Sequence, residues 1–454
     1  MAFEEHAGTD VHPVDEIPPP GRMLAFGAQH VAAMYAGVVA PPLIVGEALG
    51  LPGQQRTLLI GASLLTAGMA TLLQSWGIWR IGARLPFVNG VTFGSVAPIL
   101  AIVAQPTDGN PLSVVYGAVL VAGVLGFLLA PHFSRLVRFF PPVVTGAVIT
   151  LIGLSLLPVA VGWIAGRDPA APDHAAPGRV ALGAATFALV LLGNRFLRGF
   201  WKRISLLLGL LAGTVLAWPF GFVDATTFAQ APVFSAPVPF ALGAPAFSWS
   251  ATLSLCVVML VAMLESTADM IALGEIVERP ADERTIAAGL RADGAGSALS
   301  AVFGGFTCSA FAQNVGLVAM TRVRSRYVVA TGGGVLVLLG LFPVAGAVVS
   351  LVPQPVLGGA ALVLFGSVAA GGIRTLGRAD LGDPAQALVV AGSLGVGLIP
   401  VVQPDFYAHA PAALRAVLDS GISTGCLAAL ALNALFHRRA TADHAAPPDP
   451  SPGG

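Results

Sequence analysis

The sequence contains few charged residues. Of its 454 residues, 10% are Asp, Glu, Lys or Arg, whereas 56% are hydrophobic. A soluble domain carries about 25% charged residues, so this scarcity excludes an ordinary soluble globule. Together with a mean hydropathy of +0.82, it predicts a chain embedded in a lipid bilayer. The formal net charge is zero, which gives no reason to expect nucleic acid as a partner.

Cysteine is also scarce. Cys256, Cys308 and Cys426 lie far apart in apolar surroundings, a pattern that excludes a disulfide framework and indicates small packing residues. No CxxC pair or His cluster accompanies them, so we expect neither a metal nor another cofactor. The sequence shows no nucleophile–base arrangement and no phosphate-binding loop, so it does not predict an enzyme.

The N-terminus lacks the apolar run of a cleavable signal peptide, because no such run precedes Met23. We interpret residues 1–22 as a cytosolic tail. The C-terminal residues 437–454 are rich in Ala, Pro and Asp, and we expect them to be disordered.

Long apolar segments fill the rest of the chain. A helix needs about 20 apolar residues to cross a bilayer. By that measure the sequence predicts fourteen spans, near residues 23–46, 54–76, 88–104, 112–130, 142–164, 179–194, 204–221, 250–273, 291–305, 310–321, 327–350, 355–371, 384–401 and 416–436.

Basic residues indicate the orientation, because they accumulate in cytoplasmic loops. With the N-terminus inside and fourteen spans, 19 of the 23 basic residues fall in inner loops and 4 in outer loops. Adding or removing one span would move every later loop to the other side of the membrane, and the asymmetry of the basic residues would be lost. The distribution therefore predicts a multi-pass protein of the cell membrane with both termini in the cytoplasm.

Fourteen spans divide into two halves of seven, which must then run in opposite directions. The first repeat covers residues 23–221, a connecting loop covers 222–249, and the second repeat covers 250–436. The third and tenth spans correspond, and both are short and rich in Gly and polar residues, which is a sequence indicator of a transporter binding site. We therefore predict an all-α polytopic fold of two inverted repeats, with a short strand and a half-helix in each of these two spans.

Ionisable residues inside membrane spans are rare and suggest function. Glu265 and Asp269 are four residues apart in the eighth span, so they share one helix face. One of them could be protonated, or could bond Ser266 or Thr267. A purely structural role for one carboxylate is the alternative. We expect Glu265 to act on a substrate or a proton.

Four further polar residues lie in apolar segments. Asp293 opens the ninth predicted span, where it could cap a helix or bond the tenth span. His30 lies in the first span and could shape a site or relay protons. Gln313 and Asn314 are adjacent in the tenth span, where an extended backbone would point them to opposite sides. We expect extended backbone through Gln313 and a half-helix from about Val315.

These motifs resemble one known family. The run Gln313-Asn314-Val315-Gly316, then four residues, then Thr321-Arg322, is similar to the signature of the nucleobase–ascorbate transporters, the nucleobase:cation symporter-2 family. The stretches "GAQHVAAMYAGVVAPPLIVG", "LESTADMIALGE" and "LRADGAGSALSAVFGG" resemble its first, eighth and ninth spans. The resemblance covers residues 22 to 436.

The resemblance implies a core domain of spans 1–4 and 8–11, and a gate domain of spans 5–7 and 12–14. Short antiparallel strands in spans 3 and 10 would hold the substrate between the two domains. Family members typically form homodimers and import nucleobases with protons, rather than Na⁺, as the core moves against the gate. A nucleobase and the lipid bilayer are thus the expected partners.

The resemblance also implies roles for individual residues. Glu265 and Gln313 would bond two edges of the base, and Phe93 and Gly94 would line the site from span 3. Asn314 and His30 would brace it. Residues implied in proton coupling or in affinity are Glu265, Asp269, Asp293, Gly316, Thr321 and Arg322.

Gln313 also favours one substrate class. Uracil-type members usually carry Glu at this position, and purine-type members usually carry Gln. An amide both donates and accepts hydrogen bonds, which suits the mixed edge of xanthine or urate. The resemblance therefore favours proton-coupled import of an oxidised purine. A uracil:proton symporter and an anion transporter of the same fold are the alternatives.

Overall fold

A computed structural model describes residues 11–105, 109–133, 140–166, 171–223, 234–235, 238–342, 344, 347–348, 351–411, 414 and 417–443. For residues 200, 203, 312, 313, 320 and 437–443 it describes the backbone alone.

The described chain is almost entirely helical, and each of the fourteen predicted segments contains a helix. Eight helices in the described residues are long and apolar enough to cross a membrane. They are α1 (Pro20–Ala48), α2 (Gly53–Ser75), α4 with its extension η2 (Pro111–Leu129 and Ala130–His132), α6 (Pro142–Ala165), α7 (Pro177–Phe196), α11 (Trp249–Ile276), α16 (Gln354–Leu376) and α17 (Pro384–Val402).

The other helices are shorter or less apolar. They are η1 (Phe93–Ser95), α3 (Val96–Val103), α8 (Gly199–Arg203), α9 (Ser205–Ala217), η4 (Trp218–Phe220), α12 (Glu283–Phe303), α13 (Ala312–Thr321), α14 (Arg326–Leu341) and α19 (Gly421–Asp443). Helix α1 begins three residues before the predicted span, and α19 continues past residue 436.

Proline begins many of these helices. Helices α4, α6, α7 and α17 start at Pro111, Pro142, Pro177 and Pro384. The first N–H groups of a helix have no partner in the helix, so proline costs nothing there and its fixed φ favours the helical turn. The high proline content of the sequence is thus partly explained by helix starts.

Two short strands complete the fold. Strand β1 (Asn89–Val91) pairs antiparallel with β2 (Cys308–Ala310). These strands lie in the third and tenth predicted segments, so the predicted pair of antiparallel strands is confirmed. Each half-helix also follows its strand, as α3 follows β1 and α13 follows β2.

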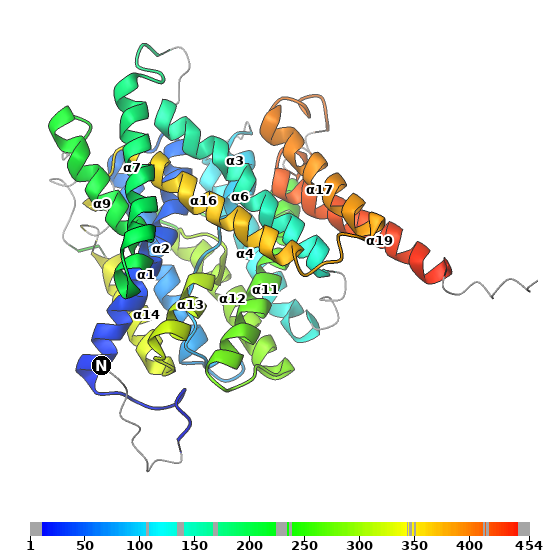
Figure 1. Ribbon diagram of the computed structural model, residues 1–454, viewed down its shortest axis with the longest axis horizontal. Coiled ribbons are helices and arrows are strands. Elements are labelled where there is room, and N and C mark those ends of the chain that lie inside the picture. Colours follow the sequence, from blue (N-terminus) through cyan, green and yellow to red (C-terminus); the bar gives the residue numbers. More distant parts are fainter. Residues whose placement is uncertain are drawn as a thin grey trace, which may run out of the picture.

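The helices pack as two groups. The strand-bearing bundle comprises α1 to α4, α11 to α14 and both strands, while the flanking bundle comprises α6, α7, α9, α16, α17 and α19. Helices α6 and α16 pack along their length and cross the front of the strand-bearing bundle in the view of Figure 1, with α7 and α9 on one side and α17 and α19 on the other.

Glycines allow the closest helix contacts in both groups. A Cβ added to Gly68 of α2 would lie 2.6 Å from the carbonyl oxygen of Gly333 in α14. A Cβ added to Gly153 of α6 would lie 2.3 Å from the backbone nitrogen of Ala369 in α16. Small residues let helix backbones approach closely where packing rather than hydrophobic burial holds them together in lipid.

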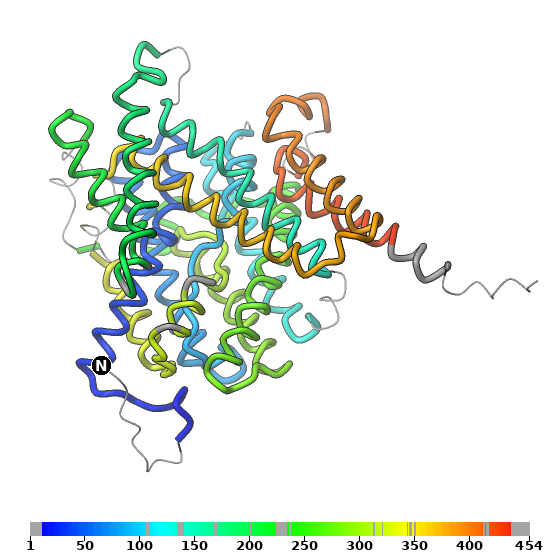
Figure 2. The backbone as a smooth tube through the Cα atoms, viewed as in Figure 1, coloured from blue at the N-terminus to red at the C-terminus, as the bar shows by residue number. Residues whose placement is uncertain are grey.

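The segment before α1 is bound to the strand-bearing bundle. The Asp15 carboxylate accepts hydrogen bonds from Arg279 (2.8 Å) and Arg326 (2.7 Å), and Val14 is fully buried. Arg326 also donates to the Trp76 carbonyl at 2.7 Å. We call this region the Asp15 end of the molecule; Figure 2 shows the N-terminal segment there, beyond the start of α1.

The opposite end of α1 holds a second polar cluster. Glu47 is paired with Arg56 of α2 and accepts a 2.6 Å hydrogen bond from Gln354 of α16. We call this region the Glu47 end. The 29 residues of α1 separate the two ends by about 40 Å, at 1.5 Å per residue.

Candidate functional site

The two strands cross in the middle of the strand-bearing bundle. Their register pairs Asn89 with Ala310 and Val91 with Cys308. One further backbone bond lies on each side, from Thr92 to Thr307 (2.9 Å) and from Phe311 to Val88 (3.1 Å). Short, buried strands of this kind need other partners for their remaining backbone groups.

Hydroxyl groups supply those partners. The Thr71 hydroxyl of α2 accepts from the Asn89 N–H (3.1 Å) and donates to the Asn89 carbonyl (3.0 Å). The Ser297 hydroxyl of α12 accepts from the Cys308 N–H (2.9 Å) and lies 3.4 Å from the Cys308 carbonyl. Each strand is thus anchored at its first residue by the helix that precedes it.

A helix begins directly after each strand. η1 starts at Phe93 and leads into α3, while α13 starts at Ala312 with Phe311 as its N-cap. The expectation of extended backbone through Gln313 is therefore wrong, because Gln313 lies in the first turn of α13. Two helix N-termini border the strand crossing, where free N–H groups and the helix dipole favour polar or anionic groups. The side chain of Gln313 lies outside the described part of the structure.

Helix α11 brings Glu265 and Asp269 to the strands. It contacts η1, β2 and α13, and the Ser266 hydroxyl accepts a 3.0 Å hydrogen bond from the Ala310 N–H of β2. Ser266 is fully buried, whereas Glu265 and Asp269 are each half-buried. A carboxylate next to an anchored residue can accept hydrogen bonds from a ligand or carry a proton.

Phe93 and Gly94 lie where the two bundles meet. The Phe93 ring packs edge-on against Phe365 of α16, with centroids 6.1 Å apart. A Cβ added to buried Gly94 would lie 3.3 Å from Ile152 of α6 and 3.8 Å from Val258 of α11. Phe93 and Gly94 thus follow β1 and face helices of both bundles.

His30 and Asn314 are hydrogen-bonded to each other. Nδ1 of His30 on α1 bonds Oδ1 of Asn314 on α13, and the Asn314 amide donates to the Pro86 carbonyl at 2.8 Å. Both side chains are buried. This chain of bonds ties α13 to α1 and to the segment that leads into β1.

Asp293 lies in the middle of α12, so it is not a helix cap. Helix α12 begins at Glu283, and Asp282 caps it by accepting from the Thr285 N–H at 2.8 Å. The Asp293 carboxylate, fully buried, accepts a 2.5 Å hydrogen bond from the Asn89 amide. It therefore bonds the third segment, so the capping alternative is wrong, and the hydrogen bond goes to β1 rather than to the tenth segment.

The other predicted residues lie along α13. The Thr321 hydroxyl donates to the Leu317 carbonyl at 2.9 Å, and Arg322 ends the helix with a positive φ of 55°. Arg322 is exposed at the Asp15 end, about a helix length from the strands, and Gly316 lies half-buried midway. The Thr321 hydroxyl thus bonds within its own helix, and Arg322 lies just beyond the end of α13 farther from β2.

Sequence reasoning missed three residues that build the site. Asn89, Thr71 and Ser297 are all fully buried polar residues. Asn89, in the run "FVNGV", is the one with a visible signal, because an amide amid apolar residues in a membrane needs a buried partner. Thr71 and Ser297 carry no such signal in the sequence, because small hydroxyl residues are common in helices. Their role becomes visible only when the structure shows the strands beside them.

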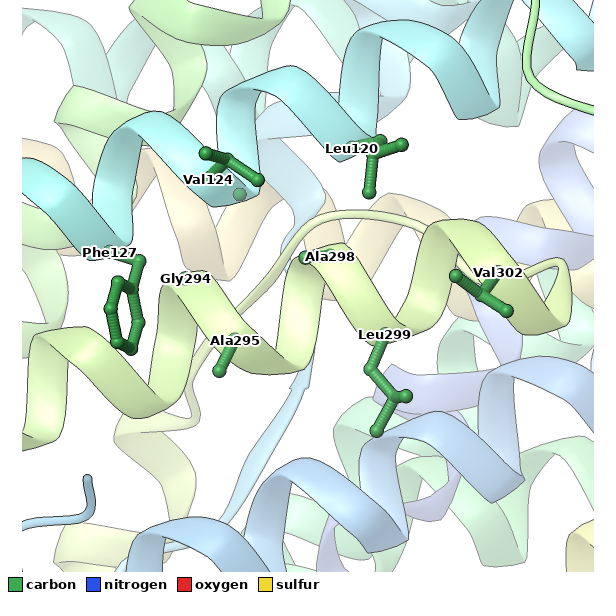
Figure 3. A pocket seen from close by; sticks show the side chains of 9 residues that line it. Leu120, Val124, Phe127, Gly294, Ala295, Ala298, Leu299 and Val302 are labelled. Carbon is green, nitrogen blue, oxygen red and sulfur yellow. The ribbon is translucent and has the colours of Figure 1, made fainter. Parts of the chain in front are cut away.

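A cavity of about 410 Å³ lies elsewhere, between α4 and α12. Apolar and small residues line it, including Leu120 and Phe127 from α4 and Gly294 and Ala298 from α12 (Figure 3). It includes none of the predicted site residues. Its apolar walls offer no polar group to orient a hydrogen-bonding ligand.

Comparison with known proteins identifies relatives along nearly the whole chain. A family model described as a permease family matches residues 21–406. The chain is 41% identical to the uric acid transporter UacT of Escherichia coli, covering 93% of this chain and 88% of that protein. It is 39% identical to the xanthine permease of Bacillus subtilis, covering 92% and 94%.

Solved structures share the fold at much lower identity. The transmembrane domain of a cyanobacterial bicarbonate transporter, BicA, aligns with a TM-score of 0.61 at 18% identity, covering 92% of this chain and 99% of that one. The murine anion transporter Slc26a9, in an inward-facing state, aligns with a TM-score of 0.64 at 12% identity, covering 96% and 74%. At these identities the likeness concerns the fold alone.

Proposed function

Because the chain belongs to the nucleobase:cation symporter-2 family of permeases, we propose that it imports an oxidised purine, xanthine or urate, together with protons. It is a transporter and not an enzyme. The observation that carries the substrate class is the identity of 39–41%, over nine-tenths of the chain, to proteins named for uric acid and xanthine.

The proposed architecture is fourteen spans in two inverted repeats. Helix packing supports this architecture. Where two helices pack closely, the two helices that lie seven spans away from them are in contact as well. The pair α2–α14 then becomes α12–α4, α1–α14 becomes α11–α4, and α7–α9 becomes α17–α19, and all six pairs are in contact. The Thr71–Asn89 and Ser297–Cys308 anchors are exchanged in the same way.

The proposed orientation puts the Asp15 end in the cytoplasm of a cell with the protein in its plasma membrane. Arg279, Arg324 and Arg326 gather there, and Arg80 lies close to Arg291. Clusters of arginine are typical of the cytoplasmic side. The Glu47 end would then face outward.

In the proposed site, Glu265 and the Gln313 amide bond opposite edges of the purine. The helix N-termini at Phe93 and Ala312 supply backbone N–H groups, and Phe93 or Gly94 covers one face of the base. The hydrogen bonds of His30 and Asn314 support a bracing role for both. Gly316, Thr321 and Arg322 would influence affinity from the Asp15 end.

Proton coupling would use the acidic residues of α11 and α12. Protonating Glu265 or Asp269 lowers the cost of moving a carboxylate through a dry intermediate. Asp293 is buried with an amide donor, so it would hold β1 in the arrangement that binds the base. A proton rather than Na⁺ is the coupling ion in this proposal.

The strand-bearing bundle would be the moving core and the flanking bundle the gate, in a homodimer. Phe93 and Gly94, which touch both bundles, place the site at the boundary that such motion opens and closes. Helices α7 and α17 are largely exposed, so their faces are available to lipid or to a second copy.

Uptake of labelled xanthine and urate into proteoliposomes tests the proposal. We expect saturable uptake that an inward proton gradient accelerates and that unlabelled xanthine inhibits more strongly than uracil. Glu265→Gln should abolish the acceleration, while folding stays normal by size-exclusion chromatography. Bicarbonate or sulfate flux without purine flux would instead support an anion transporter.

Gln313→Glu tests the assignment of substrate class. A carboxylate accepts hydrogen bonds but does not donate them when ionised, so the variant should lose about tenfold in xanthine affinity, the value of one hydrogen bond of about 1.4 kcal/mol. Its affinity for uracil should fall less or rise. The control is Thr214→Ser in α9, which keeps the hydroxyl that donates to the Leu210 carbonyl at 2.8 Å and lies outside the proposed site. Unchanged affinity for both bases would remove Gln313 from the site.

A further inference from the structure

The Glu47 end contains a polar contact between the two bundles. Glu47, near the end of α1, is 6% exposed and is paired with Arg56 of α2, and both belong to the strand-bearing bundle. Gln354 is the first residue of α16, in the flanking bundle. Its amide Nε2 donates to Oε2 of Glu47 at 2.6 Å.

The amide oxygen of Gln354 is bound by a residue of the flanking bundle. Nη2 of Arg179 on α7 lies 3.5 Å from Oε1 of Gln354, while the same guanidinium lies near the carbonyls of Trp163 and Ile164. The amide is therefore oriented by an arginine on one side and a carboxylate on the other. A hydrogen bond to a charged acceptor is stronger than one between neutral groups.

Packing around this contact is incomplete. A cavity of about 200 Å³ adjoins this contact. It is lined in part by Leu43 of α1 and Leu357 of α16, and by Phe222 and Leu351, which lie outside these two helices. Dispersion contacts between the bundles are lost wherever the walls of a cavity face empty space. The polar contact therefore holds together a part of the boundary that apolar packing leaves loose.

A second contact joins the bundles in the same half of the molecule. The hydroxyls of Ser254 on α11 and Ser423 on α19 are 2.9 Å apart, and both residues are fully buried. Ser254 lies near the start of α11, whereas the turn that follows α11 reaches Asp15 through Arg279. This contact thus lies in the half nearer Glu47.

We propose that Glu47, Arg56 and Gln354 form an outer latch, a contact that closes the external side of the boundary between the bundles while the substrate site is open to the cytoplasm. The proposal rests on the proposed function for its orientation and for the relative motion of the bundles. For the site to open outward, Gln354 must separate from Glu47. The strength of their bond therefore sets how often the outward-open state forms.

Labelling of a buried cysteine tests the latch. Leu43 is 3% exposed and lines the cavity, so Leu43→Cys reports opening of the external side. Intact cells are treated with a membrane-impermeant maleimide without substrate, and the chain without the reporter gives the background from Cys256, Cys308 and Cys426. Adding Gln354→Leu should raise the labelling rate roughly tenfold, equivalent to about 1.4 kcal/mol.

Two further variants decide the result. Gln354→Asn keeps the amide but shortens its reach by one methylene, so it should raise labelling as well, even if the leucine variant folds poorly. Glu278→Gln removes an ion pair with Arg324 within the strand-bearing bundle and should leave labelling at the parental rate. Parental labelling in both Gln354 variants, or an equal rise with Glu278→Gln, would overturn the latch.

The labelling result is independent of purine transport. If the parent fails to carry purines but the Gln354 variants still label faster, the proposed substrate is wrong and the latch stands. If purine uptake is confirmed and labelling does not change, the latch alone is wrong.

Discussion

The two bundles are held together by different interactions. In the strand-bearing bundle, buried polar side chains connect elements that are far apart in sequence, as Asn89 does with Asp293 and His30 with Asn314. Glycine packs against backbone in both bundles, but in the flanking bundle, where Gly153 of α6 meets Ala369 of α16, no Asp or Glu is buried among the described residues of the helices. One bundle carries groups that can bind and titrate, and the other provides a close-packed frame.

This difference has a physical reason. A buried polar network is costly unless every member has a partner, and it then specifies one arrangement. Strands in the middle of a membrane protein need such partners, whereas helices satisfy their own backbone groups.

The largest expected effect is in the flanking bundle. Gly153→Val would place a side chain 2.3 Å from the Ala369 nitrogen and 2.6 Å from the Phe365 carbonyl oxygen, where backbone cannot yield. We expect a loss of about 3 kcal/mol of stability, measured by thermal unfolding in detergent. Gly162→Ala in the same helix is the control, because nothing lies within 4 Å of its added Cβ. Equal melting temperatures would show that α6 and α16 are not closely packed.

An intermediate effect is expected for the buried polar pair. Asn89→Ala removes the amide that bonds the Asp293 carboxylate and should cost about 2 kcal/mol, as for a hydrogen bond to a charged group. Asn194→Ala in α7 removes a half-buried bond to the Ser205 hydroxyl and should cost about 1 kcal/mol. A larger loss for Asn194 than for Asn89, in the same melting assay, would contradict the contrast between the bundles.

The smallest effect is expected at the surface of the strand-bearing bundle. Hydrogen bonds from the Thr285 hydroxyl and N–H lower the pKa of the exposed Asp282 carboxyl. A lowered pKa in the folded state means that this stabilisation is present above the unfolded pKa of about 3.9 and is lost as the pH falls through the folded value. Asp282→Ala should therefore cost about 0.5–1 kcal/mol at neutral pH and less at strongly acidic pH.

Asp282→Asn distinguishes the contribution of the helix cap from that of the negative charge. Asparagine caps helices about as well as aspartate, so this variant should melt near the parent at neutral pH and lose the acid dependence. If Asp282→Ala destabilises equally at neutral and acidic pH, the ionised carboxylate contributes nothing.

The strands could be predicted from the sequence because their composition breaks the apolar pattern. The stretches around Asn89 and Cys308 mix Gly, Ser and Thr with β-branched and aromatic residues, and they are too short to span a bilayer as helices. The start of α13 could not be predicted, because Ala312 and Gln313 suit either extended or helical backbone. Their conformation depends on where β2 ends against β1, which is a tertiary effect.

The sequence does not reveal hydrogen-bond partners that lie far apart along the chain. Asp293 looked like a helix cap because the apolar segment starts near it, whereas the helix starts ten residues earlier at a polar turn. Asp15 looked like part of a tail because nothing in its own neighbourhood indicates that Arg279 and Arg326 converge on it. Single-sequence patterns report local periodicity, and the bonds of Asp293 and Asp15 connect positions more than 200 residues apart.

The bound N-terminal segment has a practical consequence for handling the protein. A purification tag or a fluorescent protein fused before residue 11 leaves Asp15 in place, whereas a shortened gene that starts at α1 removes the carboxylate shared by Arg279 and Arg326. Two guanidinium groups would then face each other without a counter-charge. Expression vectors for this protein should therefore keep the chain from His12 onward, even though the apolar part begins only at Pro20.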